Sequence, residues 1–148
     1  MSVKYLDMEL MKNMCHRIAL RVFDTKDDPI ACFEDHSNLL ESAINQPRQT
    51  FGGNELYPTL IDKAAILFYG INKNHPFRNG NKRISAASLI VFLYINDMQI
   101  NASKQEIVDM TLYVARSPNN EMEKVLNDIK LWIEKHIAQV EEHHITTN

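Results

Sequence analysis

The chain has 148 residues, 45% of them hydrophobic and 24% charged, with a formal net charge of −3. This length allows one domain with a real core and excludes two of ordinary size, and the composition is typical of a globular protein. The negative charge argues against direct nucleic-acid binding, and no apolar run approaches the roughly 20 residues of a membrane span. We expect a single domain over residues 1–140, followed by a polar tail over residues 141–148, without membrane association.

The start of the chain and its two cysteines favour a cytoplasmic protein. Residues 1–5 lack the apolar core of a signal peptide, and Asp7 and Glu9 follow directly. Cys15 and Cys32 have neither a metal-binding nor a redox-active spacing. We therefore expect two reduced, buried thiols.

The first predicted element is an amphipathic helix over residues 7–23, in which apolar residues recur at steps of three and four. Its buried face would consist of Met11, Met14, Ile18 and Val22. A second, short helix ends before Pro47. Its apolar positions are Leu39, Leu40, Ala43 and Ile44.

The segment 46–58 interrupts the helical pattern. It contains two prolines and the pair Gly52-Gly53, which predicts a loop or hairpin. Thr59 then has the residue type of an N-cap, so we expect the next helix to run from Leu60 to about Asn72.

A helix from Asn81 to about Ile95 has no polar face, which is typical of a helix buried on all sides. We expect this helix to be central, with the others packed around it. The small residues 85–88 would let neighbouring helices approach closely.

Three features organise the C-terminal part of the chain. Asn96-Asp97 predicts a turn, and Ser103 with Glu106 predicts a capping box for a helix to about Ala115. Ser117-Pro118 reads as the N-cap and first residue of a last helix. That helix would pack on the central helix through Met122, Val125, Leu126, Ile129, Trp132, Ile133, Ile137 and Val140, unless this stripe is an oligomer or partner surface.

The run from His75 to Arg83 has the composition of a site for an anionic ligand. Gly80 permits backbone conformations that other residues resist, and Asn81 opens the apolar helix. A helix N-terminus offers free N–H groups and a partial positive charge, which attract phosphate. Lys82 and Arg83 add two positive charges where they disfavour the helix itself, which indicates an anionic ligand.

Other residues of the run suit catalysis on such a ligand. His75 has the only side chain in the run with an ordinary pKa near neutrality, so it is the natural general base. Asn79 and Asn81 supply oxygen and N–H groups for a phosphate or a hydrated cation. Phe77 would anchor the loop in the core. A lone histidine or Lys-Arg pair is usually an ordinary surface feature, but their combination before an apolar helix is much less often accidental.

The sequence His-Pro-Phe-Arg-Asn-Gly-Asn-Lys-Arg at 75–83 resembles the signature of the Fic/Doc family, and more specifically its death-on-curing (Doc) branch. The Fic branch typically reads His-Pro-Phe-x-(Asp/Glu)-Gly-Asn-Gly-Arg, whereas Doc-like members end in Asn-Lys-Arg. Residues 49–60 also look like the segment that precedes the motif in Doc-like proteins, as does Tyr5-Leu6 before a helix bearing His16. The resemblance covers roughly residues 4–115. It implies an all-α fold: a compact helical bundle around a buried central helix, with a small β-hairpin flap.

The resemblance also implies a mechanism. His75 would accept a proton from a hydroxyl of a protein substrate, whose oxygen attacks a phosphate of ATP or another nucleoside triphosphate. Arg83 would stabilise the transition-state charge. The segment 48–53 would be the flap that pairs with the target backbone, and its positioning residues would be Gln49, Thr50 and Phe51. Nucleotide and phosphate binding would fall to Asn79, Gly80, Asn81, Lys82 and Arg83.

Lys82 bears on which phosphorus is attacked. The Fic branch has glycine at this position and transfers AMP, whereas in Doc a lysine fills that space, the nucleotide is reversed and the γ-phosphate is transferred. Lys82 therefore favours a protein kinase, with a translation factor as a hypothetical target. An AMP transferase and a non-catalytic module that binds nucleotide or a partner remain the alternatives.

Asn79 departs from the family pattern, because an Asp or Glu expected to bind Mg²⁺ usually occupies its position. An amide oxygen still coordinates a hard cation, so we expect weakened rather than absent Mg²⁺ binding. The self-inhibitory motif Ser/Thr-x-x-x-Glu-Gly/Asn of some Fic proteins is not matched at Ser37 or Ser117, which predicts a separate antitoxin protein. The pair His143-His144 is expected to belong to a solvated tail. His16, His36 and His136 have no partners at metal-ligand spacing.

Overall fold

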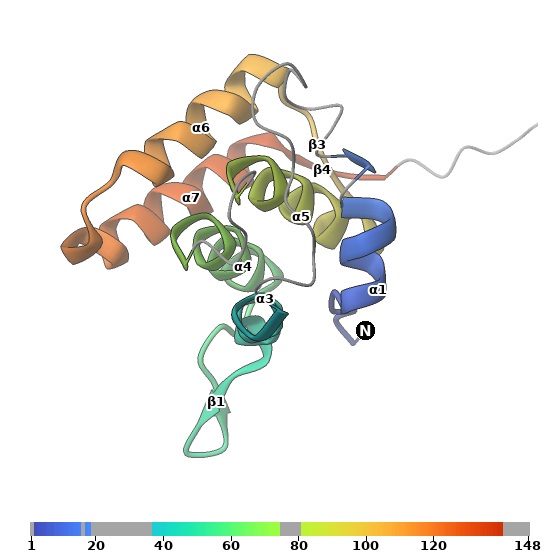
Figure 1. Cartoon of the computed structure of the whole chain (residues 1–148), viewed down its shortest axis with the longest axis vertical. Helices are drawn as coiled ribbons and strands as arrows, with labels where there is room; N and C mark the ends of the chain where they lie inside the picture. Colours follow the sequence, from blue (N-terminus) through green and yellow to red (C-terminus); the bar gives the residue numbers. More distant parts are fainter. Residues whose placement is uncertain (1, 16, 19–36, 75–80, 141–148) are drawn as a thin grey trace, which may run out of the picture.

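A computed structural model describes residues 2–15, 17–18, 37–74 and 81–140 of the chain. Helices dominate the described part, and the strands form two small antiparallel pairs (Figure 1). This arrangement confirms the predicted all-α fold with a small hairpin. None of the helices in these ranges is long and apolar enough to cross a membrane. Cys32, His16, His36 and the tail 141–148 lie outside the described residues.

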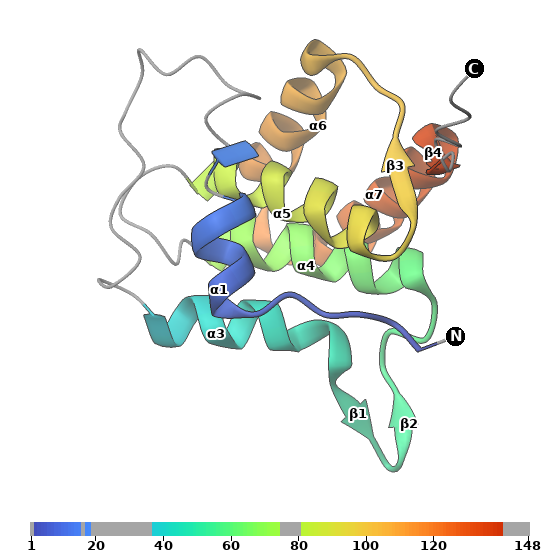
Figure 2. The same ribbon diagram turned by 90° about the vertical axis from the view of Figure 1, so that its right-hand side faces the viewer.

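Two antiparallel helices, α4 (Leu60–Asn74) and α5 (Asn81–Ile95), form the centre of the molecule (Figure 2). Thr59 caps α4 as predicted, because its hydroxyl oxygen accepts a hydrogen bond from the Asp62 N–H at 3.0 Å. The bond from Thr59 N–H to the Asp62 carboxylate, at 3.2 Å, closes the cap.

The expectation that α5 alone would be central is only partly right. Most of α5 is buried, but Tyr94 near its end is 55% exposed. α4 is buried continuously from Lys63 to Asn72 and contacts α3 (Ser37–Asn45), α5, α6 (Lys104–Arg116) and α7 (Met122–His136). The core therefore surrounds the α4–α5 pair rather than α5 by itself.

The N-terminal segment is helical at residues 8–15 and 17–18, within the predicted range 7–23, but it is not one regular α-helix. The structure has α1 (Met8–Leu10), capped by Asp7, and then a π-helical turn, η1 (Met11–Cys15). Met11 is fully buried, but Met14 is 36% exposed. A π-helical turn is wider than an α-turn, so residues three apart no longer share one face. Val22 lies outside the described residues.

The segment before α4 contains the hairpin that its glycines predict. After α3 and a short 3-10 turn, η2 (Gln46–Arg48), strand β1 (Thr50–Phe51) pairs with β2 (Asn54–Glu55). Gly52 and Gly53 connect the strands with φ of +59° and +82°. Positive φ at both central positions is the pattern of a type I′ turn, which glycine adopts without strain.

The C-terminal helices confirm one predicted boundary and correct another. The capping box at the start of α6 is present, with 3.1 Å bonds between Ser103 and Glu106 in both directions. Ser117 does not cap the last helix. It ends α6 instead, because its N–H and its hydroxyl both donate to the Val114 carbonyl. A 3-10 turn, η3 (Asn119–Glu121), precedes α7.

The last helix is also shorter than predicted and packs elsewhere. Its buried residues, among them Ile129, face α4 rather than chiefly α5. The chain becomes extended after His136, so Ile137 and Val140 are not helical. Strand β4 (Ile137–Gln139) pairs antiparallel with β3 (Met98–Ile100), a sheet that periodicity did not predict. An apolar stripe alone does not separate the end of a helix from a short strand.

Candidate functional site

The first part of the predicted loop is not placed. His75, Asn79 and Gly80 lie outside the described residues, so their catalytic, phosphate-binding and metal-binding roles stay predictions. The two ends that this loop joins are described, because α4 ends at Asn74 and α5 begins at Asn81. The site is therefore considered from the helix ends that flank the loop.

Lys82 and Arg83 occupy different environments in the first turn of α5. Lys82 is exposed, whereas only 6% of Arg83 is exposed. The Lys82 carbonyl accepts a 2.7 Å hydrogen bond from the Ser85 hydroxyl, which holds this turn in place. A helix N-terminus with one buried guanidinium and one exposed ammonium suits an anionic ligand such as a nucleotide phosphate.

A buried amide ties this turn to the rest of the core. The Asn72 side-chain nitrogen donates to the Ser85 hydroxyl oxygen at 3.4 Å and to the Thr111 carbonyl at 3.1 Å. Asn72 thereby links the last turn of α4 to α5 and α6. Within the described ranges, its Oδ1 atom is buried without a hydrogen-bond partner.

The end of α4, from which the loop begins, is also attached to the segment after α6. Lys73, two residues before His75 in the sequence, donates from Nζ to the Ser117 carbonyl at 2.5 Å. Asn72 and Lys73 thus attach the last turn of α4 to α6 and to the turn after it. The sequence pattern identified neither contact, because both partners are backbone carbonyls distant in the chain.

The predicted flap is a projecting hairpin (Figures 1 and 2). Gln49, Thr50 and Phe51 are all exposed, and Phe51 is 79% exposed. The first strand's backbone is paired to β2 on one side only within the described sheet. An exposed edge with a free apolar side chain is suited to pairing with an extended segment of another chain.

Both ends of the hairpin are attached to the body. At the first end Pro47 is buried, and the Arg48 guanidinium lies 4.3 Å from the centre of the Tyr5 ring. At the second end Lys63, which is 1% exposed, bonds from Nζ to the Glu55 carboxylate at 3.1 Å and to the Tyr57 carbonyl. The hairpin therefore projects from two attachment points next to the start of α4.

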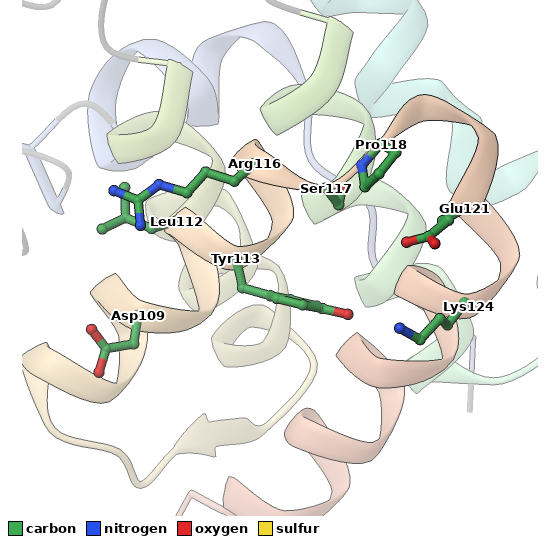
Figure 3. A pocket seen from close by; sticks show the side chains of 8 residues that line it. All are labelled: Asp109, Leu112, Tyr113, Arg116, Ser117, Pro118, Glu121 and Lys124. Carbon is green, nitrogen blue, oxygen red and sulfur yellow. The ribbon is translucent and has the colours of Figure 1, made fainter.

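A groove of about 430 Å³ lies between α6 and α7 (Figure 3). Its lining contains two acidic residues, Asp109 and Glu121, and two basic residues, Arg116 and Lys124, so the formal charges of the lining cancel. The Tyr113 hydroxyl hydrogen-bonds the Asp128 carboxylate at 2.5 Å, and this bond raises the pKa of Tyr113. A groove without excess positive charge does not match a triphosphate, in contrast to the start of α5.

Among the described residues, no group of three or more His, Cys, Asp or Glu side chains is arranged to hold a metal ion. The residue predicted to contact Mg²⁺, Asn79, lies outside them. His136 is 9% exposed and bonds to Glu106 at 3.0 Å and to the Trp132 carbonyl at 2.7 Å. Its contacts belong to the packing of α6 on α7.

A comparison with known protein families shows which family the chain belongs to. The family model described as "Fic/DOC family" matches residues 5–93, more than half of the chain. The protein is a member of the Fic/DOC family. The match includes the loop 75–83, the flap and the start of α5, and it ends before residue 115, the limit expected from the sequence. The predicted family resemblance is therefore confirmed.

A curated relative points to the Doc branch. A protein named Toxin Doc, from Mycolicibacterium smegmatis, is 42% identical to this chain over 64 residues. The alignment covers 43% of this chain and 49% of the relative, so the match spans about half of that protein's length. No solved structure matches the chain significantly.

Two residues near the site were not identified from the sequence. Lys63 interrupts an apolar stretch of α4, and Asn72 does the same near its end. A polar side chain inside a buried helix indicates a specific partner, because burial without one is costly. That signal was available, but the partners Glu55, Tyr57, Ser85 and Thr111 follow only from the three-dimensional arrangement.

Proposed function

We propose that this protein is the toxin of a toxin–antitoxin pair and that it transfers the γ-phosphate of ATP to a hydroxyl of a protein. The supporting observation is the start of α5, where Arg83 is buried and Lys82 is exposed at the end of the run 75–83 that resembles the family signature. The similarity to a protein named Toxin Doc supports the toxin role and, with it, a separate antitoxin.

In the proposed reaction, His75 accepts the proton of the target Ser, Thr or Tyr hydroxyl. The hydroxyl oxygen forms a bond to the γ-phosphorus, the bond from that phosphorus to the β,γ-bridging oxygen breaks, and ADP leaves. Arg83 and the N–H groups at the start of α5 offset the negative charge of the transferred phosphoryl group. Mg²⁺ would neutralise phosphate charge when bound, with Asn79 as a weak ligand.

The protein substrate would meet the exposed edge of the hairpin. Pairing of an extended target segment with Thr50 and Phe51 would hold the target at the hairpin. A translation factor is the target class that the family resemblance suggests. The antitoxin would act by covering the nucleotide site or the flap hairpin.

Labelling of a cell lysate tests this proposal. With γ-labelled ATP, one or a few proteins should become labelled, and His75→Ala should abolish the label without changing the thermal unfolding midpoint. Label arriving only from α-labelled ATP would support AMP transfer instead. Absence of label from either nucleotide, together with unchanged growth when the protein is expressed, would support a non-catalytic binding module.

A further inference from the structure

The hairpin flap has little structural support of its own. Each strand has two residues, and Thr50, Phe51, Asn54 and Glu55 are all exposed. A short two-stranded hairpin without a buried face is marginally stable in water. Its direction relative to the body must therefore be set where the chain enters and leaves it.

Lys63 has an unusual position at the second of these points. It is one of the largest fully buried side chains, although it carries a charge. Burial of an ammonium group is unfavourable unless its hydrogen-bonding capacity is used. The Lys63 ammonium group donates to the carboxylate of Glu55, the last residue of β2, and to the carbonyl of Tyr57, two residues later.

The bond from Lys63 to Glu55 fixes the position of the hairpin relative to the body of the protein. Lys63 lies in a helix that packs against most other elements, so its Nζ atom has a fixed position in the body. Glu55 belongs to β2, and its strand partner across the hairpin is Thr50. A bond that fixes Glu55 therefore also limits where Thr50 and the exposed edge of β1 can lie.

We propose that Lys63 is a positioning residue of the transferase: its ammonium group fixes the flap hairpin in the orientation that receives the protein target. The kinetic part rests on the proposed function, whereas the structural part does not. Loss of the ammonium group would leave the fold of the core in place but would let the hairpin take many orientations, so target binding would weaken and nucleotide binding would not.

Hydrogen exchange tests the structural part without any assay of activity. Lys63→Met keeps the apolar stem of the side chain and removes its charge. The Leu56 N–H, which donates to the Gln49 carbonyl at 3.0 Å, should exchange about tenfold faster in this variant, as expected for the loss of charge-assisted bonds. Amides of α5 should keep their protection.

Two further variants separate this effect from general destabilisation. Glu55→Gln changes an exposed partner and leaves the core untouched, and roughly threefold faster exchange of Leu56 is expected from the weaker neutral bond. Lys73→Met, the matched control, removes a 2.5 Å bond from Nζ to the Ser117 carbonyl near the opposite end of the same helix. It should leave exchange of Leu56 unchanged.

The kinetic arm uses ATP and lysate protein as probes. Lys63→Met should lower γ-label transfer about tenfold at limiting lysate concentration, with an unchanged dissociation constant for ATP and less loss at high lysate concentration. Unchanged exchange of Leu56 in both Lys63→Met and Glu55→Gln would overturn the proposal, as would equally accelerated exchange of Leu56 in Lys73→Met. If the unaltered protein transfers no label, the proposed function fails, and exchange alone still decides whether Lys63 orients the hairpin.

Discussion

The side-chain nitrogen of Asn72 lies 3.4 Å from the hydroxyl oxygen of Ser85, which in turn donates to the Lys82 carbonyl at 2.7 Å. A single buried amide thus connects the end of α4 with the first turn of α5. The proposed phosphate site consists of this turn and the loop between the two helices. Its geometry therefore depends on a polar contact inside the core as well as on apolar packing.

Replacing Asn72 with alanine should destabilise the protein by about 1–2 kcal/mol. The variant loses the bonds to Ser85 and Thr111, and part of that loss is offset because the unpartnered Oδ1 atom is also removed. Urea unfolding should show a lower midpoint with an unchanged slope. Asn120→Ala, at an exposed position after α6, is the control and should change the free energy of unfolding by less than about 0.5 kcal/mol.

Arg83→Lys should reduce label transfer by roughly 10²-fold while the protein stays folded. Lysine keeps the charge but lacks the planar set of donors that holds two phosphate oxygens at once. Arg116→Lys makes the same exchange at an exposed position of α6 and should retain full transfer. Equal activity of the Arg83 variant and the wild-type protein would show that Arg83 does not contact the transferred group.

The pH dependence of stability should contain a contribution from Glu106. Bonds from the Ser103 backbone, from His136 and from the Ser103 hydroxyl hold the pKa of Glu106 below its ordinary value. The folded protein therefore releases this proton more readily than the unfolded chain does, and the stabilisation is complete above the unfolded pKa of about 4.3. It is lost as the pH falls through the lower pKa of the folded state.

Glu106→Gln should remove this contribution, because glutamine maintains a capping box but carries no charge. The free energy of unfolding, measured by urea denaturation from pH 6 down to about pH 3, should fall less steeply in the variant. Glu134→Gln, at an exposed position of α7, is the matched control and should follow the wild-type curve. A wild-type slope in the Glu106 variant would contradict the assignment.

Local signals in the sequence were sufficient for most of the fold, whereas the position of the site stays a prediction. The Thr59 and Ser103 caps and the Gly52-Gly53 turn depend on residues close in the chain, so their chemistry can be read directly. The start of α7 and strand β4 were missed for the opposite reason. Ser117 suits either end of a helix, and Ile137 becomes a strand residue only because β3 lies beside it.

The candidate site also has features that could be read from the sequence and contacts that could not. The start of α5 at Asn81, with Lys82 and Arg83 in its first turn, was predictable, whereas the anionic ligand expected there stays a prediction. The supporting contacts of Lys63 and Asn72 were not predictable, since each joins residues brought together only by the packing of α4. Periodicity identified α4 as a helix but did not show that its polar residues hold the flap and the first turn of α5.

Lys82 provides the sharpest test of which phosphate is transferred. Its side chain is exposed at the start of α5, where the Fic pattern has glycine. We expect Lys82→Gly to reduce label transfer from γ-labelled ATP at least tenfold, because a charge that holds the reversed nucleotide is lost. The space left by the side chain should also permit the opposite nucleotide orientation, so weak transfer from α-labelled ATP should appear.

Lys104→Gly, at the first position of α6, is the matched control for the cost of glycine near a helix start and should transfer γ-label at the wild-type rate. Undiminished γ-transfer by Lys82→Gly would show that the nucleotide orientation is set elsewhere, and the residues of the loop before α5 would then be the ones to substitute.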